Sequence, residues 1–450
     1  MEPNLMLFRL IIVFLIPVIT FAKSISDYRP YSYELIFTNP KCKKHSYSKP
    51  LLNLLGDEVS HKKVNAYCAP SDTWPVNQQL GTPHKKILDW IQDPETKEIF
   101  MAYLSFSKTS VIKALCKAVK ERNLKLTLIV DEKNKKDKYR MRNILNLKKC
   151  IAKKTHYRKI HRPLILTGGH QGEGYDKIGY AHNKLIFINP NSRKKVRIVF
   201  SSGNMSSGTT THHENWHFLT TNVKTHFVQA HLCLKEGLLH HQNSKRVFSK
   251  FIKQCRSKIT TPEESDLKVF FIPGSGKRLT KQLYKEFKNS KRVKMAAHRF
   301  SNGSLIKMIK ENLQRSHFEA SIIVDDDLHW TGVFNKDFGR NTLYEFQKLM
   351  ELEDHGLEIK YIETYADRVN EPKSLQLQHN KFIIFTKWNE AGTVLTGAGN
   401  LTNAAFYKNF ENFYLISIPE VYKNFLRQYD YLWDLGLSHQ ELPIRLELPK

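Results

Sequence analysis

The sequence predicts an α/β protein built from two similar domains in tandem, and a long internal repeat is the main evidence. Residues 101–131 and 295–325 share an ordered set of residues at a constant displacement of 194 positions. Each copy has an apolar β-rich run, a turn of Ser, Gly or Asn, an amphipathic helix such as 111–119, and a second strand at 126–130 or 320–324. This order indicates βαβ units and a mostly parallel sheet in each half.

Length and composition agree with this organisation. The chain has 450 residues, of which 41% are hydrophobic, so it can hold about two or three domains with substantial cores. A disordered tail and a fibre are excluded. We expect a first domain over 30–240, a linker over 241–264, a second domain over 265–437 and a tail over 438–450.

The first residues indicate export. Arg9 precedes an apolar run over 10–21, and Thr20 and Ala22 are the small residues that suit a signal peptidase cut after Ala22. The run is short for a membrane span, although an uncleaved anchor is the alternative. Residues 1–22 therefore predict a secretory signal peptide and a secreted or periplasmic protein.

The cysteines agree with an oxidising compartment. They are even in number and all precede residue 256, which favours disulfides, with buried free thiols as the alternative. No two have C-x-x-C spacing, which argues against a zinc or redox role. They are Cys42, Cys68, Cys116, Cys150, Cys233 and Cys255.

A second set of matched residues follows in each half. A His-x-Lys motif precedes an apolar strand, a small-residue box ending in Asn comes next, and a Glu-Asn pair begins 32 positions after the histidine. Chance could supply one such motif but not the whole ordered set twice. The candidate site residues are His182, Lys184, Asn204, Glu214, His379, Lys381, Asn400 and Glu411.

These residue types suit attack on a phosphodiester. Its negative charge requires cations on the nonbridging oxygens and a nucleophile that is neutral at working pH, as histidine is. On a strand, alternate side chains share a face, so the lysine ammonium lies beside the imidazole. The asparagines can donate to the same oxygens, and a glutamate can accept the other ring N–H of a histidine.

The motifs resemble the H-x-K-x4-D and G-S-x-N motifs of the phospholipase D superfamily, and the resemblance covers nearly all of the mature chain. The end of the second copy looks most like the branch of bacterial nucleases and mitochondrial cardiolipin hydrolases. The resemblance implies two tandem phospholipase D-like αβα sandwich domains with mixed, mostly parallel sheets, related by a pseudo-twofold axis.

The resemblance also implies a mechanism. The two histidines share one site, where His182 attacks phosphorus to form a phosphohistidine and His379 protonates the leaving oxygen. Lys184 and Lys381 supply the positive charge, so neither a metal nor a cofactor is expected. Because one chain holds both motifs, we expect a monomer with no obligate protein partner.

The sequence departs from the family pattern in several places. Asn189 and Thr386 stand where members usually carry the motif aspartate, and Ser201 and Ala398 alter the G-S-x-N boxes. The aspartate is understood to support structure at the end of the strand. A degenerate, non-catalytic copy or protein is therefore an alternative.

Two other motifs invite different interpretations. His213-Glu214-Asn215-Trp216-His217 spells H-E-x-x-H, which on a helix would bind zinc. The β-rich neighbours favour a strand, on which the histidines lie about 13 Å apart. The glycine-rich stretch 168–174 lacks the G-K-[ST] of a phosphate loop, so we expect a flexible loop at the rim of the site.

The charge indicates the substrate class. The net charge is +28, and residues 131–162 hold thirteen Lys or Arg against three acids, with aromatic residues between them. Such a segment suits a nucleic-acid backbone, although it would also bind anionic phospholipid or be a solvated surface. A nuclease acting on DNA or RNA is favoured. The alternatives are a phospholipase D or cardiolipin synthase-type enzyme and a non-catalytic nucleic-acid or membrane-binding module.

Overall fold

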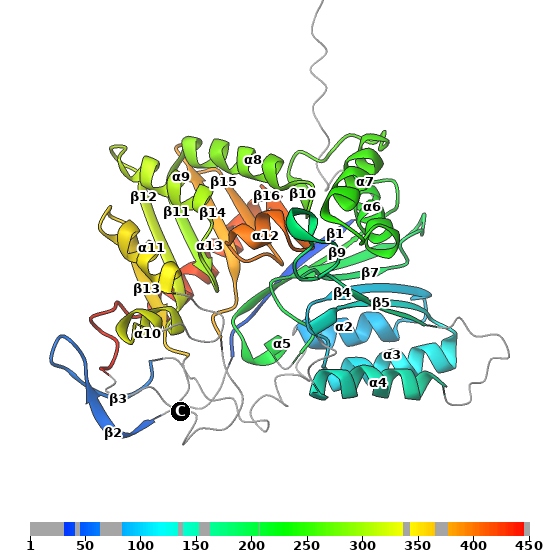
Figure 1. Cartoon of the computed structure of the whole chain (residues 1–450), viewed down its shortest axis with the longest axis horizontal. Coiled ribbons are helices and arrows are strands. Elements are labelled where there is room, and N and C mark those ends of the chain that lie inside the picture. Colours follow the sequence, from blue (N-terminus) through cyan, green and yellow to red (C-terminus); the bar gives the residue numbers. More distant parts are fainter. Residues whose placement is uncertain are drawn as a thin grey trace, which may run out of the picture.

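The computed structural model describes residues 31–40, 46–63, 83–133, 138–152, 163–206, 208–335, 343–364 and 377–444. These residues form two seven-stranded sheets and a small hairpin, β2 (Ser46–Leu52) and β3 (Glu58–His61), with helices packed on the sheets (Figure 1). The predicted α/β fold with two similar domains is confirmed.

The first sheet has the strand order β1-β9-β8-β7-β4-β5-β6. The pairs β4·β5 and β5·β6 are parallel, whereas the other four neighbouring pairs are antiparallel. Its strands are β1 (Ser32–Thr38), β4 (Glu98–Tyr103), β5 (Lys125–Asp131), β6 (Leu164–Gly168), β7 (Lys184–Ile188), β8 (Val196–Ser201) and β9 (Glu214–Thr221).

The second sheet repeats this topology in the order β10-β16-β15-β14-β11-β12-β13. The sheets are mixed, as expected, but antiparallel pairs outnumber parallel ones in both. The βαβ pattern predicted only the parallel edge, because the matched segments 101–131 and 295–325 contain only the parallel pairs β4·β5 and β11·β12. Its strands are β10 (Leu267–Ile272), β11 (Ser290–Ala297), β12 (Glu319–Asp325), β13 (Glu358–Ile362), β14 (Lys381–Lys387), β15 (Gly392–Gly397) and β16 (Glu411–Ile416).

Helices cover both faces of the first sheet. Figure 1 shows α2 (Pro83–Gln92), α3 (Thr109–Arg122) and α4 (Lys138–Ala152) on one face, and α6 (His226–His240) with α7 (Lys245–Ser257) on the other. The apolar spacing in α3 buries one side of the helix, as the amphipathic pattern predicts. The remaining helices are α5 (Gly208–Thr211), α8 (Gly276–Asn289), α9 (Gly303–Leu313), α10 (Asp327–Val333), α11 (Leu343–Glu353), α12 (Asn403–Tyr407), α13 (Pro419–Leu435) and the 3₁₀ turn η3 (Gly174–Asp176).

One hydrophobic core joins the two halves. It combines apolar side chains from both sheets with helices α6 and α13, so Phe200 of the first half stacks on Tyr414 of the second at 3.7 Å between ring centroids. Each half also has an outer core between its sheet and its own helices. The sheets are therefore held in a fixed relation, which positions the loops at their shared edge.

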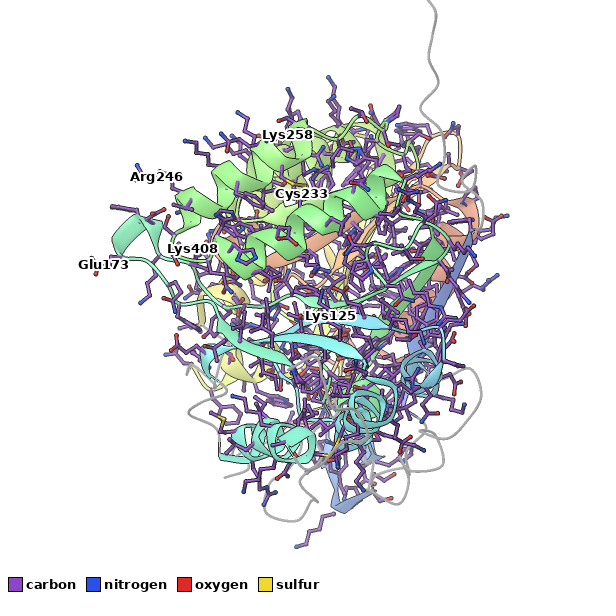
Figure 2. All side chains as sticks on the ribbon, turned by 90° about the vertical axis from the view of Figure 1, so that its right-hand side faces the viewer. Lys125, Glu173, Cys233, Arg246, Lys258 and Lys408 are labelled. Atoms are coloured by element: carbon purple, nitrogen blue, oxygen red, sulfur yellow. A yellow bond between two sulfur atoms is a disulfide. The ribbon has the colours of Figure 1, made fainter. Side chains whose placement is uncertain are left out.

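Two disulfides join neighbouring helices. Cys116–Cys150 links α3 to α4, and Cys233–Cys255 links α6 to α7, with Cα–Cα distances of 6.1 and 5.8 Å (Figure 2 shows Cys233 on its helix). The segment expected as a linker, 241–264, thus contains helix α7.

Some expectations fall outside the described residues. The expected signal peptide over 1–22 and the cysteines Cys42 and Cys68 belong to the parts that the structure does not describe. Within the described ranges, none of the helices combines the length and hydropathy needed to cross a bilayer.

Candidate active site

The two His-x-Lys segments lie where the halves meet, and each is held by the backbone of the other half. His182 donates its N–H to the carbonyl of Phe410 at 2.9 Å, and Phe410 donates back to Tyr180 at 2.9 Å. In the same way, His379 donates to the carbonyl of His213 at 3.0 Å. This exchange is reciprocal, and it is compatible with the expected pseudo-twofold relation.

Each histidine also faces a glutamate from the opposite half. His182 Nδ1 is hydrogen-bonded to Glu411 Oε2 at 2.8 Å, and His379 Nδ1 lies 2.9 Å from Glu214 Oε1. All four side chains are buried. The sequence spacing links each histidine to the glutamate of its own half, so the exchange of partners becomes visible only in the assembled fold.

The two lysines stand beside their histidines. Lys184 Nζ lies 3.2 Å from both ring nitrogens of His182 and donates to the carbonyl of Ala398, in the other half, at 3.4 Å. Lys381 Nζ donates to the carbonyl of His379 at 2.6 Å. Strands β7 and β14 begin at the lysines, so the histidines precede the strands instead of lying within them.

The boxes after the next strands bring small residues and asparagines to the site. The amide oxygens of Asn204 and Asn400 are buried and accept no hydrogen bond from the residues that the structure describes. Buried polar atoms are normally paired, so these atoms are available to a bound ligand or water. A Cβ at Gly203 would overlap the carboxylate of Glu214 and the ring of Trp216, so only glycine fits there.

Charged groups of one half shift the pKa values of site residues in the other half. Burial, followed by the charge of Lys184, lowers the pKa of Lys381 well below its usual value. Burial lowers the pKa of His379 in the same direction, with Lys381 and Lys184 among the further causes. Burial also raises the pKa of Glu411 to about 8. Two ammonium groups that repel each other in a buried site favour the arrival of an anion, because its charge relieves the repulsion.

Two hydrogen bonds between asparagines also join the two halves. Asn183, inside the first His-x-Lys motif, donates to Asn412 Oδ1 at 3.3 Å, and Asn215 donates to Asn380 Oδ1 at 3.0 Å. The Glu-Asn pairs noted in the sequence therefore serve two purposes. The glutamate faces a histidine of the opposite half, and the asparagine holds the His-x-Lys segment that carries that histidine.

Two aspartates that sequence reasoning did not select position the histidines. Asp131 Oδ2 accepts the N–H of Ala181, and Asp325 Oδ2 accepts the N–H of Gln378, both at 2.7 Å. Each acceptor holds the residue immediately before a histidine. The sequence signal for these aspartates is the Val-Asp pair that ends the second strand of each repeat.

The residues that replace the motif aspartates make structural contacts. Asn189 Oδ1 accepts the N–H groups of Lys97 and Glu98 at 2.9 and 3.1 Å, which ties the end of β7 to the start of β4. Thr386 Oγ1 forms a hydrogen bond with Tyr422 Oη at 2.9 Å. Asn189 thus supplies the backbone acceptor that a carboxylate would supply at this place.

The H-E-x-x-H motif has the strand conformation that its neighbours predict, because β9 begins at Glu214. His213 Nδ1 contacts Asn39 Oδ1 at 3.1 Å, and His217 Nδ1 contacts Tyr33 Oη at 2.7 Å. The two histidines have separate partners and do not face a common metal position.

The structure describes all of the glycine-rich stretch and part of the basic segment. In the glycine-rich stretch, His170 donates its N–H to Gly179 O at 2.7 Å and its Nε2 lies 3.3 Å from Asp131 Oδ1, which places this loop beside the residues that lead to His182. Of the basic segment 131–162, residues 134–137 and 153–162 lie outside the described residues.

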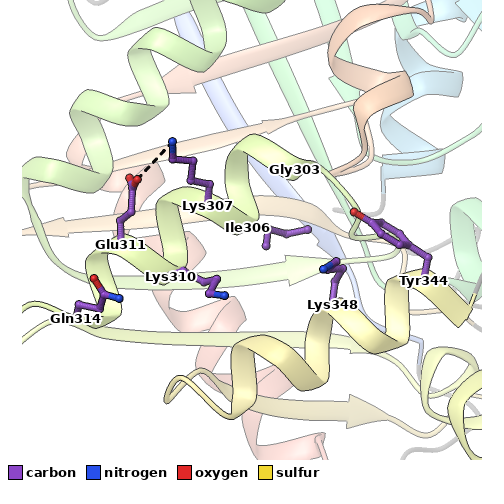
Figure 3. A pocket seen from close by; sticks show the side chains of 8 residues that line it. All are labelled: Gly303, Ile306, Lys307, Lys310, Glu311, Gln314, Tyr344 and Lys348. Atoms are coloured by element: carbon purple, nitrogen blue, oxygen red, sulfur yellow. Dashed lines mark ion pairs between the residues drawn. The ribbon is translucent and has the colours of Figure 1, made fainter.

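A shallow groove of about 420 Å³ lies between α9 and α11 (Figure 3). Its lysines are paired with glutamates: Lys310 and Lys348 contact Glu351 at 2.7 and 2.6 Å, and Lys307 lies 3.7 Å from Glu311. None of the candidate site residues lines it. Its lining residues are Gly303, Ile306, Lys307, Lys310, Glu311, Gln314, Tyr344 and Lys348.

Comparison with known proteins gives one family match and several solved structures. Residues 283–433 match the family described as "Cardiolipin synthase, PLD-like domain". Phosphatidylserine synthase from Haemophilus influenzae has 13% identity and a TM-score of 0.54, covering 81% of this chain and 87% of that one. The phospholipase D family member Nuc from Salmonella typhimurium has 22% identity and a TM-score of 0.29, covering 38% and 95%.

Polyphosphate kinase from Porphyromonas gingivalis has 13% identity and a TM-score of 0.45 over 81% of this chain, which spans 50% of that protein's length. Among curated protein sequences, nothing matches the chain significantly. The family match covers most of the second half, and the fold of phosphatidylserine synthase extends over both halves. The matched family and the shared fold agree with the resemblance of the duplicated His-x-Lys segments to the phospholipase D superfamily.

Proposed function

We propose that this protein is a metal-independent phosphodiesterase that acts through a covalent phosphohistidine, and that its substrate is DNA or RNA. The exchange of glutamates between the halves is the observation that carries the proposal. His182 with Glu411, and His379 with Glu214, place two supported imidazoles at one boundary. A two-histidine mechanism requires this arrangement.

The proposed reaction proceeds in two displacements. With its Nδ1 on Glu411, His182 uses Nε2 to attack phosphorus, and the bond to the leaving oxygen breaks as His379 gives that oxygen a proton. His379 then takes a proton from water, whose oxygen attacks phosphorus and releases His182. Lys184 and Lys381 stabilise the charge on the nonbridging oxygens.

The electrostatics bear on which of the two histidines is the nucleophile. The lowered pKa of His379 favours its neutral form, which is the form that a nucleophile needs. The assignment by resemblance makes His182 the nucleophile instead. A phosphate trapped on His379 would exchange the two roles and leave the chemistry unchanged.

Charge supports nucleic acid as the substrate. The net charge of +28 gives the chain a strong attraction to a polyanion, and binding through phosphates weakens steeply with salt. The two disulfides and the N-terminal sequence support a secreted or periplasmic location. We further propose that the protein acts as a monomer, because both motifs belong to one chain.

The test is cleavage of labelled DNA and RNA by the purified mature protein in excess EDTA. We expect cleavage to persist, and His182→Ala and His379→Ala each to reduce it about 10³-fold. His240→Ala, which removes an exposed side chain on α6, is the matched control. Quenching with an alkaline denaturant during turnover, followed by peptide mass spectrometry without acid, should find a phosphoryl adduct on one of the two site histidines.

Other outcomes separate the alternatives. Loss of cleavage in EDTA would contradict the metal-free mechanism. Headgroup release from phosphatidylglycerol or cardiolipin vesicles, with nucleic acids intact, would instead support a phospholipase D-type enzyme. Tight, salt-sensitive binding without cleavage of any substrate would support a binding module.

A further inference from the structure

The two glutamates of the site differ in the residue that stands two positions before them. In the second half this residue is Asn409, whose Nδ2 donates to Glu411 Oε1 at 3.0 Å. In the first half it is His212, whose Nδ1 lies 3.4 Å from Glu214 Oε1. One carboxylate thus has an amide donor, whereas the other has a third imidazole beside it.

This third imidazole completes a compact set of metal ligands. His379 Nδ1 lies 2.9 Å from the same Glu214 Oε1, and one ligand atom from each of His212, Glu214 and His379 lies within 4.8 Å of the others. Ligand atoms bound about 2.0–2.1 Å from a tetrahedral Zn²⁺ are about 3.4 Å apart. The distance of 3.4 Å from His212 to Glu214 equals this value, and the distance of 2.9 Å from His379 to Glu214 is shorter than it. Two imidazoles with one carboxylate are a donor set that zinc takes.

The polar atoms of this cluster are also unsatisfied. Both carboxylate oxygens of Glu214, and Nδ1 of His379, are buried and make no hydrogen bond to the described residues, although His379 Nδ1 lies 2.9 Å from Glu214 Oε1. Glu214 is only 1% exposed. By contrast, Glu411 is hydrogen-bonded to both Asn409 and His182. Of the two site glutamates, only Glu214 therefore has carboxylate oxygens that are available to bind a metal ion.

We propose that His212, Glu214 and His379 form a Zn²⁺ site that inhibits the enzyme when it is occupied. Zinc bound to His379 Nδ1 and Glu214 separates this histidine from its carboxylate, so His379 can no longer be protonated and deprotonated in turn. Binding requires the loss of any proton on the three ligands and no redox step. The binding site stands by itself, whereas its inhibitory effect rests on the proposed phosphodiesterase function.

The decisive variant is His212→Asn, which copies the residue that the second half uses at the matching position. Full-length mature protein is freed of metal with EDTA, desalted and titrated with ZnCl₂ by calorimetry, while cleavage of labelled DNA and RNA is followed in parallel. The wild type should bind one Zn²⁺ and lose cleavage as the site fills. His212→Asn should bind at least about 100-fold more weakly and retain cleavage in zinc concentrations that inhibit the wild type.

Controls distinguish loss of the zinc site from misfolding and from failure of the proposed function. His240→Asn, which alters an exposed histidine near Glu236, should behave as the wild type, and thermal melting should show that His212→Asn is folded. Equal zinc affinity in wild type and His212→Asn would overturn the site, and occupied zinc that leaves cleavage unchanged would overturn the inhibition. If no phosphodiester is cleaved, calorimetry still tests the site, and only the proposed function fails.

Discussion

At the scale of single residues, the position of Glu214 depends on the absence of a side chain at Gly203. A Cβ at this position would overlap the Glu214 carboxylate and the Trp216 ring, both of which are buried. Interiors are close-packed, so the carboxylate would have to move away from His379. The glycine of the small-residue box therefore supports the site by leaving room for the Glu214 carboxylate.

We predict that Gly203→Ala reduces phosphodiester cleavage by about 10²-fold, because His379 loses the carboxylate that orients it. The loss should appear in kcat, since Lys184 and Lys381, the proposed substrate-binding residues, are unchanged. Gly303→Ala, where a Cβ meets nothing within 4 Å, is the matched control and should cleave normally. Steady-state kinetics on a labelled substrate provide the measurement, and equal kcat in both variants would contradict the prediction.

Replacement of Asn189 should have a predictable effect on the free energy of unfolding. Its backbone has a φ of 50°, its Oδ1 accepts from Lys97 and Glu98, and its Nδ2 donates to Glu95 O at 2.8 Å. Asn189→Ala should lower the free energy of unfolding by about 2 kcal/mol, because it loses these bonds and strains the left-handed backbone. Asn189→Asp keeps the acceptor and should lose less. Urea unfolding measures both variants, and equal losses would show that the acceptor is unimportant.

The residues of the site were predictable to the extent that they form a repeated pattern. All eight candidates come from the matched motifs, and the structure brings both histidines, both lysines and both glutamates to one boundary. The pairing of His182 with Glu411 was not predictable, because spacing along the chain carries no information about which half supplies a partner. Asp131 and Asp325 were missed because they act on backbone N–H groups.

At the scale of elements, the start of helix α6 depends on a buried carboxyl. Glu264, which follows α7, accepts the N–H of Phe227 at 3.1 Å and is 1% exposed. Burial raises the pKa of Glu264 to about 7. A folded-state pKa above the unfolded value means that this group stabilises the protein fully below about pH 4.5, and that the contribution is lost as the pH rises through about 7.

We therefore predict that the wild type loses about 3 kcal/mol of unfolding free energy relative to Glu264→Gln between pH 4.5 and 8. Glutamine keeps the acceptor for Phe227 but cannot ionise, so it lacks this pH dependence. Urea unfolding of both proteins at several pH values gives the difference. Two curves that remain parallel over this range would show that the carboxyl ionises without a burial cost.

Elements were predictable where the sequence pattern is periodic. The repeat predicted α3, β5 and β12, because their apolar spacing matches helix or strand periods over enough residues. It did not predict helix α7, whose Lys-rich sequence lies in the segment expected as a linker. The antiparallel strands were missed for a different reason, since the matched segments 101–131 and 295–325 contain only parallel pairs.

At the scale of the whole molecule, the shared core makes the two halves one folding unit. Helix α6 of the first half and helix α13 of the second pack in the same cluster, together with inward-facing residues of both sheets. Phe200 lies at its centre, stacked on His217 of its own half and on Tyr414 of the other. Neither half can bury these surfaces alone, so we expect them to unfold together.

We predict that Phe200→Ala lowers the unfolding free energy by about 3–5 kcal/mol and that the loss is felt in both halves. Hydrogen exchange with mass spectrometry measures this directly, because the most protected amides of β14 and β15 report the second half. Their opening free energy should fall by the same amount as that of β7 and β8. Phe385→Ala, in the outer core of the second half, is the reciprocal variant and should lower protection in the first half. Protection that falls only in the mutated half would show that the halves unfold independently. The candidate active site, which is built from both halves, could then open without either half unfolding.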